Sequence, residues 1–208
     1  MAFVKRSIVE PLTEDERKGS RGCADLIASL EDPNPTARRW AARDLLSCPE
    51  ALPALVARLR NEVDISVREV ILTSIISLGD PASMAGLVEC LRSEDPCLRN
   101  EAIEAMKQLP DEVAPIMGSL LSDPDPDLRI FSINILESLR HSQVETWLVE
   151  VIEKDPVVNV CGTAVDLLAE VGSSFSIGAL ERLRDRFPEE PYIQFAANLA
   201  LKRIHDGR

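Results

Sequence analysis

The chain has 208 residues, of which 45% are apolar and only 4% aromatic, and its formal net charge is −12. An acidic chain is repelled at long range by nucleic acid and by anionic membranes, so we expect neither as a partner. With so few aromatic residues, the core must consist of Leu, Ile, Val and Ala, a composition that favours packed helices over a β-sandwich.

The first segment, residues 1–20, lacks the pattern that follows it, and we expect an extended arm and linker there. Apolar residues near its start precede a charged run, so the arm would pack on the first helices or pair with another chain, which gives a route to homo-oligomers. No apolar run reaches signal-peptide length or the ~20 residues of a membrane span. A cytoplasmic location is therefore expected.

Short loops of one kind recur from position 34 onward at intervals of 30 or 31 residues. They occupy residues 34–38, 64–68, 95–99, 125–129 and 155–159, and a diverged copy follows at 190–194. Each of the five begins with Asp or Asn, which can accept hydrogen bonds at a helix start. Four continue with Pro, which suits the first helical turn. A fixed period of this length is the sequence signature of a solenoid.

Each loop precedes an apolar stripe at helical spacing, and a Pro or Gly break then precedes a second stripe. This pattern predicts an all-α fold, a right-handed α-solenoid of five to six helix pairs that forms a single domain over residues 21–205. The expected helices, in chain order, are 22–31, 36–47, 51–61, 66–78, 81–92, 96–108, 111–121, 126–139, 143–153, 156–171, 174–186 and 190–204.

The five cysteines are odd in number and form no CxxC pair, which argues against a zinc site or a dithiol motif. We expect all of them to be reduced, buried thiols that act as small apolar residues. They are Cys23, Cys48, Cys90, Cys97 and Cys161. We therefore expect no metal site and no cofactor.

The D-P-x-x-R loops and the phrase Ser77-Leu78-Gly79-Asp80-Pro81-Ala82 resemble HEAT-like repeat proteins of the phycobilisome-lyase type. The resemblance covers about residues 22–204. It implies that loop acids and helix arginines of neighbouring repeats form a structural ladder of ion pairs. The acids would be Asp64, Asp95, Asp125 and Asp155, and the arginines Arg38, Arg68, Arg99 and Arg129. The ladder should fade at both ends, where Asn34, Asn159 and Gln194 depart from the pattern.

The resemblance also implies that the second helices line a concave face that binds partners. The candidate contact residues on that face are Arg58, Glu89, Met117, Trp147, Glu150 and Glu181. Trp147 stands where other repeats have small residues, which marks it either as an anchor for a partner or as the filler of a gap between helices.

Catalytic chemistry has little support in the residues. The only two histidines, His141 and His205, lie far apart in the sequence, and no Gly-rich phosphate loop occurs. We therefore expect no catalytic residues and no enzyme. The chain is expected to be an adaptor or scaffold that binds another protein through its concave face.

Two alternatives remain open. The resemblance implies a phycobilin lyase, or a lyase-like subunit that binds the chromophore. A DNA-binding or DNA-repair HEAT-like protein is the other alternative, because Trp40 sits beside Arg38, Arg39 and Arg43. The acidity of the chain and the interior position of Trp40 in the repeat argue against DNA.

Overall fold

The computed structural model describes residues 21–78 and 81–207. The predicted arm at residues 1–20 lies outside the described residues. Contacts divide the chain into two compact units, with the boundary after Ser93. The prediction of a single domain over residues 21–205 stays a prediction.

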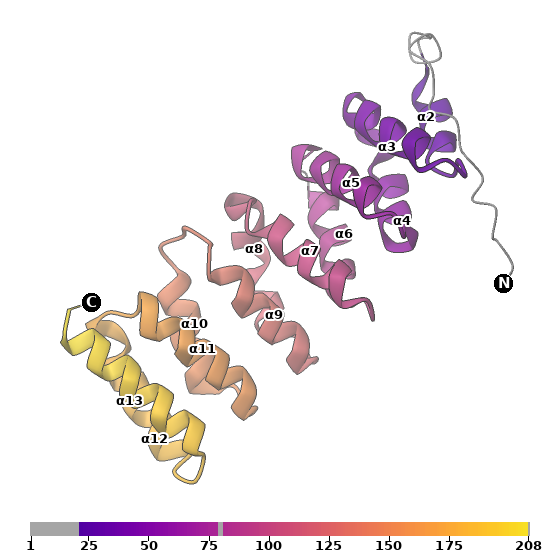
Figure 1. Ribbon diagram of the computed structural model, residues 1–208. Helices are drawn as coiled ribbons and strands as arrows, with labels where there is room; N and C mark the ends of the chain where they lie inside the picture. Colours follow the sequence, from indigo (N-terminus) through magenta and orange to yellow (C-terminus); the bar gives the residue numbers. More distant parts are fainter. Residues whose placement is uncertain (1–20, 79–80, 208) are drawn as a thin grey trace, which may run out of the picture. The chain divides into compact units, whose positions relative to one another are not determined.

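The first unit contains five α-helices and two short 3₁₀ turns in its described part (Figure 1). In chain order they are α2 (Cys23–Ser29), α3 (Pro35–Asp44), η1 (Leu45–Ser47), η2 (Pro49–Ala51), α4 (Leu52–Asn61), α5 (Ile65–Leu78) and α6 (Pro81–Leu91). Helices α3 and α5 pack side by side, with α4 packed against α5 and α6.

The second unit continues with seven α-helices and one 3₁₀ turn. They are α7 (Pro96–Met106), α8 (Pro110–Leu120), α9 (Pro126–Leu136), α10 (Val144–Lys154), α11 (Val158–Val171), η3 (Ser174–Ser176), α12 (Ile177–Arg186) and α13 (Pro191–His205). The first helices of successive pairs, α7, α9, α11 and α13, pack in a row, and α10 and α12 form a second layer against them.

The described residues form helices without any strand, and every predicted helix end lies within three residues of the observed one. The all-α fold of HEAT-type helix pairs is thus confirmed. Among the described helices, none has the length and the apolar content that crossing a membrane would require.

The five first helices that follow the repeated loops begin with one and the same local contact. The loop residue accepts a hydrogen bond from the backbone N–H two residues later, in each case at 2.9 Å. The acceptors are Asn34, Asp64, Asp95, Asp125 and Asp155. Four of these bonds satisfy a free N–H group in the first turn of the helix, whereas the bond from Val157 holds the residue directly before α11. Capping of this kind explains why Asp or Asn recurs in the loops.

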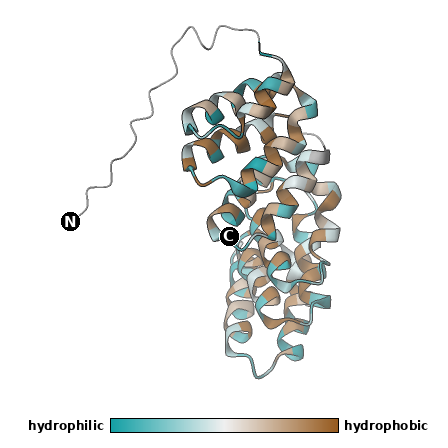
Figure 2. Ribbon diagram, turned by 90° about the vertical axis from the view of Figure 1, so that its right-hand side faces the viewer, coloured by the Kyte–Doolittle hydropathy of each residue, from teal (hydrophilic) through white to brown (hydrophobic). Residues whose placement is uncertain are grey.

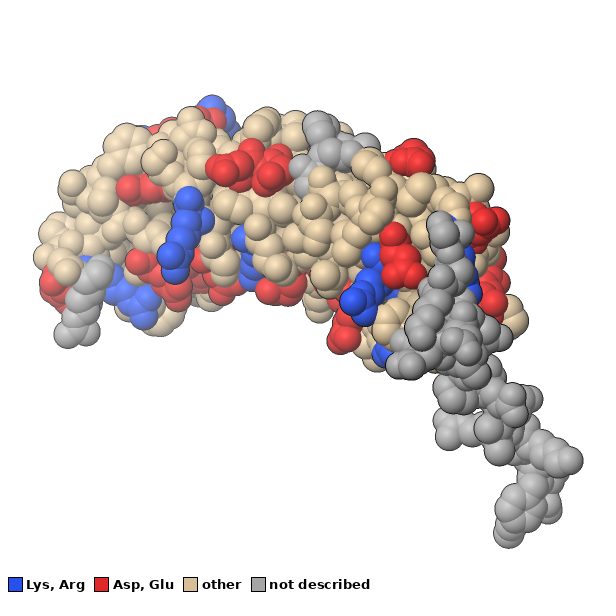
Figure 3. Space-filling model, turned by 90° about the horizontal axis from the view of Figure 1, so that it is seen from above, with Lys and Arg blue, Asp and Glu red and all other residues tan. Residues whose placement is uncertain are grey.

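Apolar side chains form the buried core within each unit. In Figure 2, apolar and polar residues alternate along the helices. Fully buried positions recur one per repeat, for example Ala41, Ile71 and Ala102. Burial of such side chains supplies the main favourable free energy of folding. Most charged groups lie at the surface, and Figure 3 shows acidic side chains in scattered groups, with some basic ones, on a face that is mostly uncharged.

Helix α8 corrects one prediction, because Met117 is fully buried and is no surface contact residue. The buried stripe of α8 runs through Val113, Met117 and Leu120, with Ile116 only half-buried. The prediction that Met117 lies on the surface would put the neighbouring Ile116 on the buried stripe, one residue too early. That shift turned a core residue towards the expected binding face.

The cysteines correct a second prediction. Cys23 at the start of α2 and Cys48 after η1 form a disulfide with a Cα–Cα distance of 5.9 Å. Cys97 is exposed, and only Cys90 and Cys161 are buried free thiols. The sequence could not reveal the pair because the fold of α2 against α3 and η1 joins residues that are 25 positions apart.

Candidate functional site

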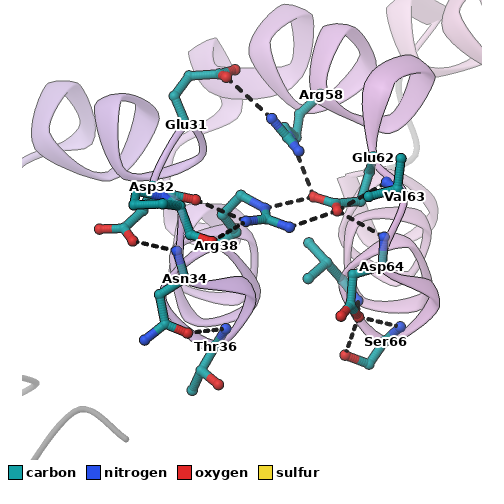
Figure 4. A network of polar contacts seen from close by, with 12 residues as sticks. Glu31, Asp32, Asn34, Thr36, Arg38, Arg58, Glu62, Val63, Asp64 and Ser66 are labelled. Carbon is teal, nitrogen blue, oxygen red and sulfur yellow. Dashed lines mark hydrogen bonds and ion pairs between the residues drawn. The ribbon is translucent and has the colours of Figure 1, made fainter. Parts of the chain in front are cut away.

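In the first unit, Arg38 of α3 holds both the loop of its own repeat and an acid of the next one (Figure 4). Its guanidinium donates to the two carboxylate oxygens of Glu62 at 2.7 Å each, and to the main-chain oxygen of Asp32 at 2.8 Å. Arg58 donates to the same carboxylate at 2.9 Å. The Glu62 carboxylate therefore accepts hydrogen bonds from two arginines and links α3 to the loop after α4.

The buried Glu62 stays ionised. Burial alone would raise its pKa, but hydrogen bonds from Arg38, from the backbone N–H of Asp64 and from Arg58 outweigh burial and lower the pKa to about 2. The hydrogen bond to Glu62 in turn raises the pKa of Arg38. This cluster is therefore a fixed ionic link and not a proton-transfer site.

The acid that meets Arg38 is Glu62, and the predicted ladder acid Asp64 has another role. Asp64 accepts the backbone N–H of Ser66 at 2.9 Å and its hydroxyl at 2.6 Å, at the start of α5. The hydroxyl bond from Ser66 is the largest cause of a lowered pKa at Asp64. Because α4 ends at Asn61, the longer side chain of Glu62 already belongs to the loop and reaches α3 first.

In the second unit, Arg129 of α9 makes the equivalent contacts. Its Nε and Nη2 donate to the two carboxylate oxygens of Asp155 at 2.6 and 3.0 Å, and its Nη1 donates to the main-chain oxygen of Asp123 at 2.8 Å. Asp155 also accepts the backbone N–H of Val157. Both members of the pair are buried, and the hydrogen bond to Asp155 raises the pKa of Arg129.

The other predicted ladder residues lie in three settings. Asp95 and Asp125 accept N–H groups at the starts of α7 and α9. Arg68 is buried on α5. The guanidinium of Arg99 lies 5.4 Å from the centre of the Phe131 ring. Ion pairing between these acids and arginines stays a prediction.

Towards the C-terminus, two residues with no predicted role bind main-chain oxygens in place of the repeat arginine. Arg186, from the end of α12, donates to the main-chain oxygens of Glu153, in the last turn of α10, and of Asp155, at 2.6 and 2.8 Å. Gln194 of α13 donates to the main-chain oxygens of Arg184, near the end of α12, and of Phe187, at 2.9 and 3.0 Å. The shorter Asn159 was a visible sign that the pattern changes here, but it does not reveal which residue compensates.

A hollow beside the Arg129–Asp155 pair brings two of the predicted contact residues together, and we call it the Trp147 pocket. Its volume is about 340 Å³. It lies between the end of α8 with the following loop, one side of α10, and the loop before α11. The lining residues are Gly118, Leu121, Ser122, Asp123, Arg129, Trp147, Glu150, Val151, Lys154, Asp155 and Pro156.

The indole of Trp147 is half-buried, and one of its faces is covered. The ring of His141 stacks on it with centroids 5.1 Å apart and an angle of 10° between the planes. His141 is itself held in the loop, because its Nδ1 accepts the backbone N–H of Gln143 at 3.2 Å. The stack fixes the orientation of the indole beside the pocket. Gly118 also lines the pocket, and an added Cβ atom there would meet no atom within 4 Å.

The remaining predicted contact residues do not line the Trp147 pocket. Arg58 bridges Glu62 and, at 3.1 Å, Glu31 of the first unit. Glu89 of α6 and Glu181 of α12 are exposed. A binding role for these three residues stays a prediction, as does that of Trp147 and Glu150.

HEAT repeats match residues 23–107 and 113–202, which together span most of the sequence. The chain belongs to the HEAT-repeat family. This confirms the family resemblance inferred from the repeated loops, and it agrees with the helix pairs described above.

Two curated relatives of this HEAT-repeat chain are named bilin biosynthesis protein PecE. The protein from Mastigocladus laminosus is 37% identical over 97 residues, which cover 42% of this chain and 36% of the relative. The protein from Nostoc sp. (strain PCC 7120) is 36% identical over 74 residues, which cover 35% of this chain and 29% of the relative. The HEAT-repeat chain thus matches about a third of the length of these relatives.

A solved structure, the complex of CpcE and CpcF of phycocyanin lyase from Nostoc sp. PCC7120, is 18% identical, with a TM-score of 0.38 over 94% of this chain and 99% of that one. The names of the curated relatives correct the expectation that the HEAT-repeat chain is not an enzyme. Proteins that share more than a third of its residues over the matched part are named for bilin biosynthesis. The sequence resemblance implied a phycobilin lyase only as an alternative, because the repeat residues themselves report on packing.

Proposed function

We propose that this HEAT-repeat protein is a phycobilin lyase-type subunit that holds part of an open-chain tetrapyrrole in the Trp147 pocket. The observation that carries the proposal is the 36–37% identity to two bilin biosynthesis proteins. A pure scaffold offers no reason for that similarity. The alternative implied by the sequence resemblance therefore replaces the adaptor as the preferred function.

The size and the surfaces of the Trp147 pocket suit a flat conjugated ligand. Its volume of about 340 Å³ lies at the lower end of the range for small-molecule sites, so it would take one end of a tetrapyrrole while the rest lies outside. Trp147 offers an indole beside the pocket, already oriented by His141, against which a pyrrole ring can pack. Gly118 lines the pocket without a side chain and so leaves room for the ligand.

The charged groups of the pocket match the polar groups of a bilin. A bilin carries propionate side chains and pyrrole N–H donors. Lys154 and Glu150 form an exposed ion pair at 3.1 Å, and such pairs contribute at most about 1 kcal/mol. Lys154 can thus exchange Glu150 for a propionate, and the released Glu150 can accept a pyrrole N–H. In the buried Arg129–Asp155 pair the two charges neutralise each other, so the pair lines the pocket and does not bind the ligand's polar groups.

A lyase-type subunit must also meet another protein, because the chromophore is delivered to a cysteine of an acceptor protein. Protein binding was expected from the repeat architecture, and under this proposal the partner is the acceptor or a second subunit. CpcE and CpcF of phycocyanin lyase form a complex with each other.

Fluorescence titration with a bilin tests the proposal directly. The chain has two tryptophans, so a Trp40→Phe variant leaves Trp147 as the sole indole reporter. Addition of biliverdin at micromolar concentration should quench Trp147 emission and shift the absorbance of the bilin with the same saturation curve. A bilin spectrum that does not change in the presence of the protein would exclude the proposed function.

A further inference from the structure

The Cys23–Cys48 disulfide borders a pocket in the first unit, and none of the residues that line this pocket is used in the proposed function. This hollow, the Trp40 pocket, has a volume of about 610 Å³. It lies between α2, α3 and the loop after η1, and both cysteines belong to its lining, together with Trp40, Arg21 and Arg43. A disulfide that borders an open pocket is within reach of a dissolved thiol, unlike one sealed in a core.

The two sulfur atoms differ in access. Cys48 is buried, with 4% of its surface exposed, whereas Cys23 is half-buried at the start of α2. An incoming thiolate therefore meets Cys23 first, and attack along the disulfide axis makes the sulfur of Cys48 the leaving group. The difference in exposure therefore determines which sulfur is attacked and which one leaves.

The charge of the Trp40 pocket favours an anionic thiol. The exposed guanidinium of Arg43 lies 5.2 Å from the centre of the Trp40 ring, which orients it beside the pocket. Arg21 adds a second cation to the lining, where the acid is Asp44, while a further acid, Glu50, lies beside the sulfur atoms and is not part of the lining. The apolar side chains of Leu26 and Leu46 complete the wall. A peptide-sized thiol with carboxylates fits both this volume and this charge.

We propose that the Trp40 pocket is a thiol-exchange site that takes an anionic peptide thiol of the glutathione class. The thiolate attacks the sulfur of Cys23, a new S–S bond forms between ligand and Cys23, and the Cys23–Cys48 bond breaks. The electron pair of the broken bond stays on Cys48, which takes up a proton from water. The number of disulfides is unchanged, so the exchange itself needs no oxidant.

Glu50 favours the product of this exchange. One of its carboxylate oxygens lies within 4.8 Å of both sulfur atoms. A negative charge at that distance disfavours a thiolate on Cys48 and so promotes its protonation. The protonated thiol is a poor nucleophile, and the reverse attack on the mixed disulfide is slowed. The exchange also removes the covalent tie between α2 and the loop after η1.

Mass spectrometry of the oxidised full chain tests this site. The chain carries a Cys97→Ser substitution, so that no exposed free thiol can take part in secondary exchange. It is treated with reduced glutathione, or with cysteamine as a cationic thiol, at equal thiolate concentration. Samples are acid-quenched and alkylated at early times, and the adduct is mapped. We expect a glutathione adduct on Cys23, formed at least about threefold faster than the cysteamine adduct, as one exposed charge pair allows.

Two arginine variants separate the pocket from general surface charge. Arg43→Gln should remove most of the preference for glutathione and leave the cysteamine rate unchanged. Arg39→Gln is the matched control, because Arg39 is exposed on the same helix, 6.0 Å from the Trp40 ring, but does not line the pocket. The proposal is overturned if the oxidised chain lacks the Cys23–Cys48 bond, if the adduct maps to Cys48, if both thiols react equally fast, or if the two arginine variants behave alike.

Discussion

Arg129 and Asp155 form a buried, two-pronged ion pair that joins the first helix of one repeat to the loop that opens the next, with Nε and Oδ2 2.6 Å apart. Arg38 and Glu62 repeat the arrangement in the first unit. In both places the same guanidinium also holds the carbonyl groups of its own loop. One arginine thus fixes the spacing between two helix pairs.

Loss of the buried arginine should destabilise the second unit strongly. Arg129→Ala leaves Asp155 buried without its partner, which typically costs about 3–5 kcal/mol of the free energy of unfolding. Arg182→Ala is the control, because Arg182 pairs with Glu153 at the surface, where such pairs contribute at most about 1 kcal/mol. Urea unfolding followed by circular dichroism measures both. Equal losses in the two variants would mean that the buried pair does not hold the repeats together.

Acid should weaken the first unit through Glu62. Its pKa in the folded chain is about 2, below the ordinary value of 4.5, so its contribution is fully present above about pH 4.5 and is lost as the pH falls towards 2. Glu62→Gln removes the titrating group. Thermal melting of both chains between pH 7 and pH 2 should show a large difference at neutral pH that shrinks in acid. A difference that is independent of pH contradicts the assigned pKa.

The close contact between α4 and α6 requires a residue without a side chain at position 86, which is Gly86. A Cβ atom at Gly86 would lie 2.4 Å from Cγ2 of Val56, and a β-branched side chain has little freedom to move away. Gly86→Ala should therefore cost roughly 1–3 kcal/mol of stability, although alanine favours helices. The double variant Gly86→Ala/Val56→Ala should lose less than the sum of the two single variants. Additive losses would show that the two positions do not touch.

The sequence predicted the fold more completely than it predicted the contacts of the candidate site. The loops around Asp95 and Asp125 predicted the helix starts because capping is a local interaction, decided within a few residues. The partner of Arg38 escaped prediction, because Glu62 and Asp64 are both acidic and only the end of α4 decides which one turns towards α3. Long-range contacts of this kind follow from the packing of helices.

The prediction for Met117 was wrong, and the role of Arg186 was not predicted, for a related reason. One residue of shift along α8 exchanges a buried position for an exposed one, and a repeat pattern does not fix its register that finely. Arg186 replaces the missing repeat arginine from another helix, so no periodic signal marks it. Trp147 could be singled out because a large residue at a position of small ones is visible in the sequence itself, and its binding role stays a prediction.

The charge of Lys154 should matter only for a bilin that carries carboxylates. Lys154→Gln removes the proposed partner of a propionate and should weaken biliverdin binding by about threefold or more, the value of an exposed charge pair. Biliverdin dimethyl ester lacks that charge, and its affinity should be the same for both proteins. Isothermal titration calorimetry with the two ligands gives the comparison. If the variant weakens both ligands equally, Lys154 does not bind a propionate.

The most direct test of the account fills the Trp147 pocket without touching a polar group. Gly118→Leu places a side chain into open space on α8 and replaces a poor helix former by a good one, so the fold should be retained. Ser119→Leu adds the same side chain one position away, at an exposed residue that does not line the pocket. Absorbance titration with biliverdin should show an affinity at least roughly tenfold lower for Gly118→Leu, a loss of about 1.4 kcal/mol, and an unchanged affinity for Ser119→Leu. Equal binding by both variants would place the bilin elsewhere and contradict the account.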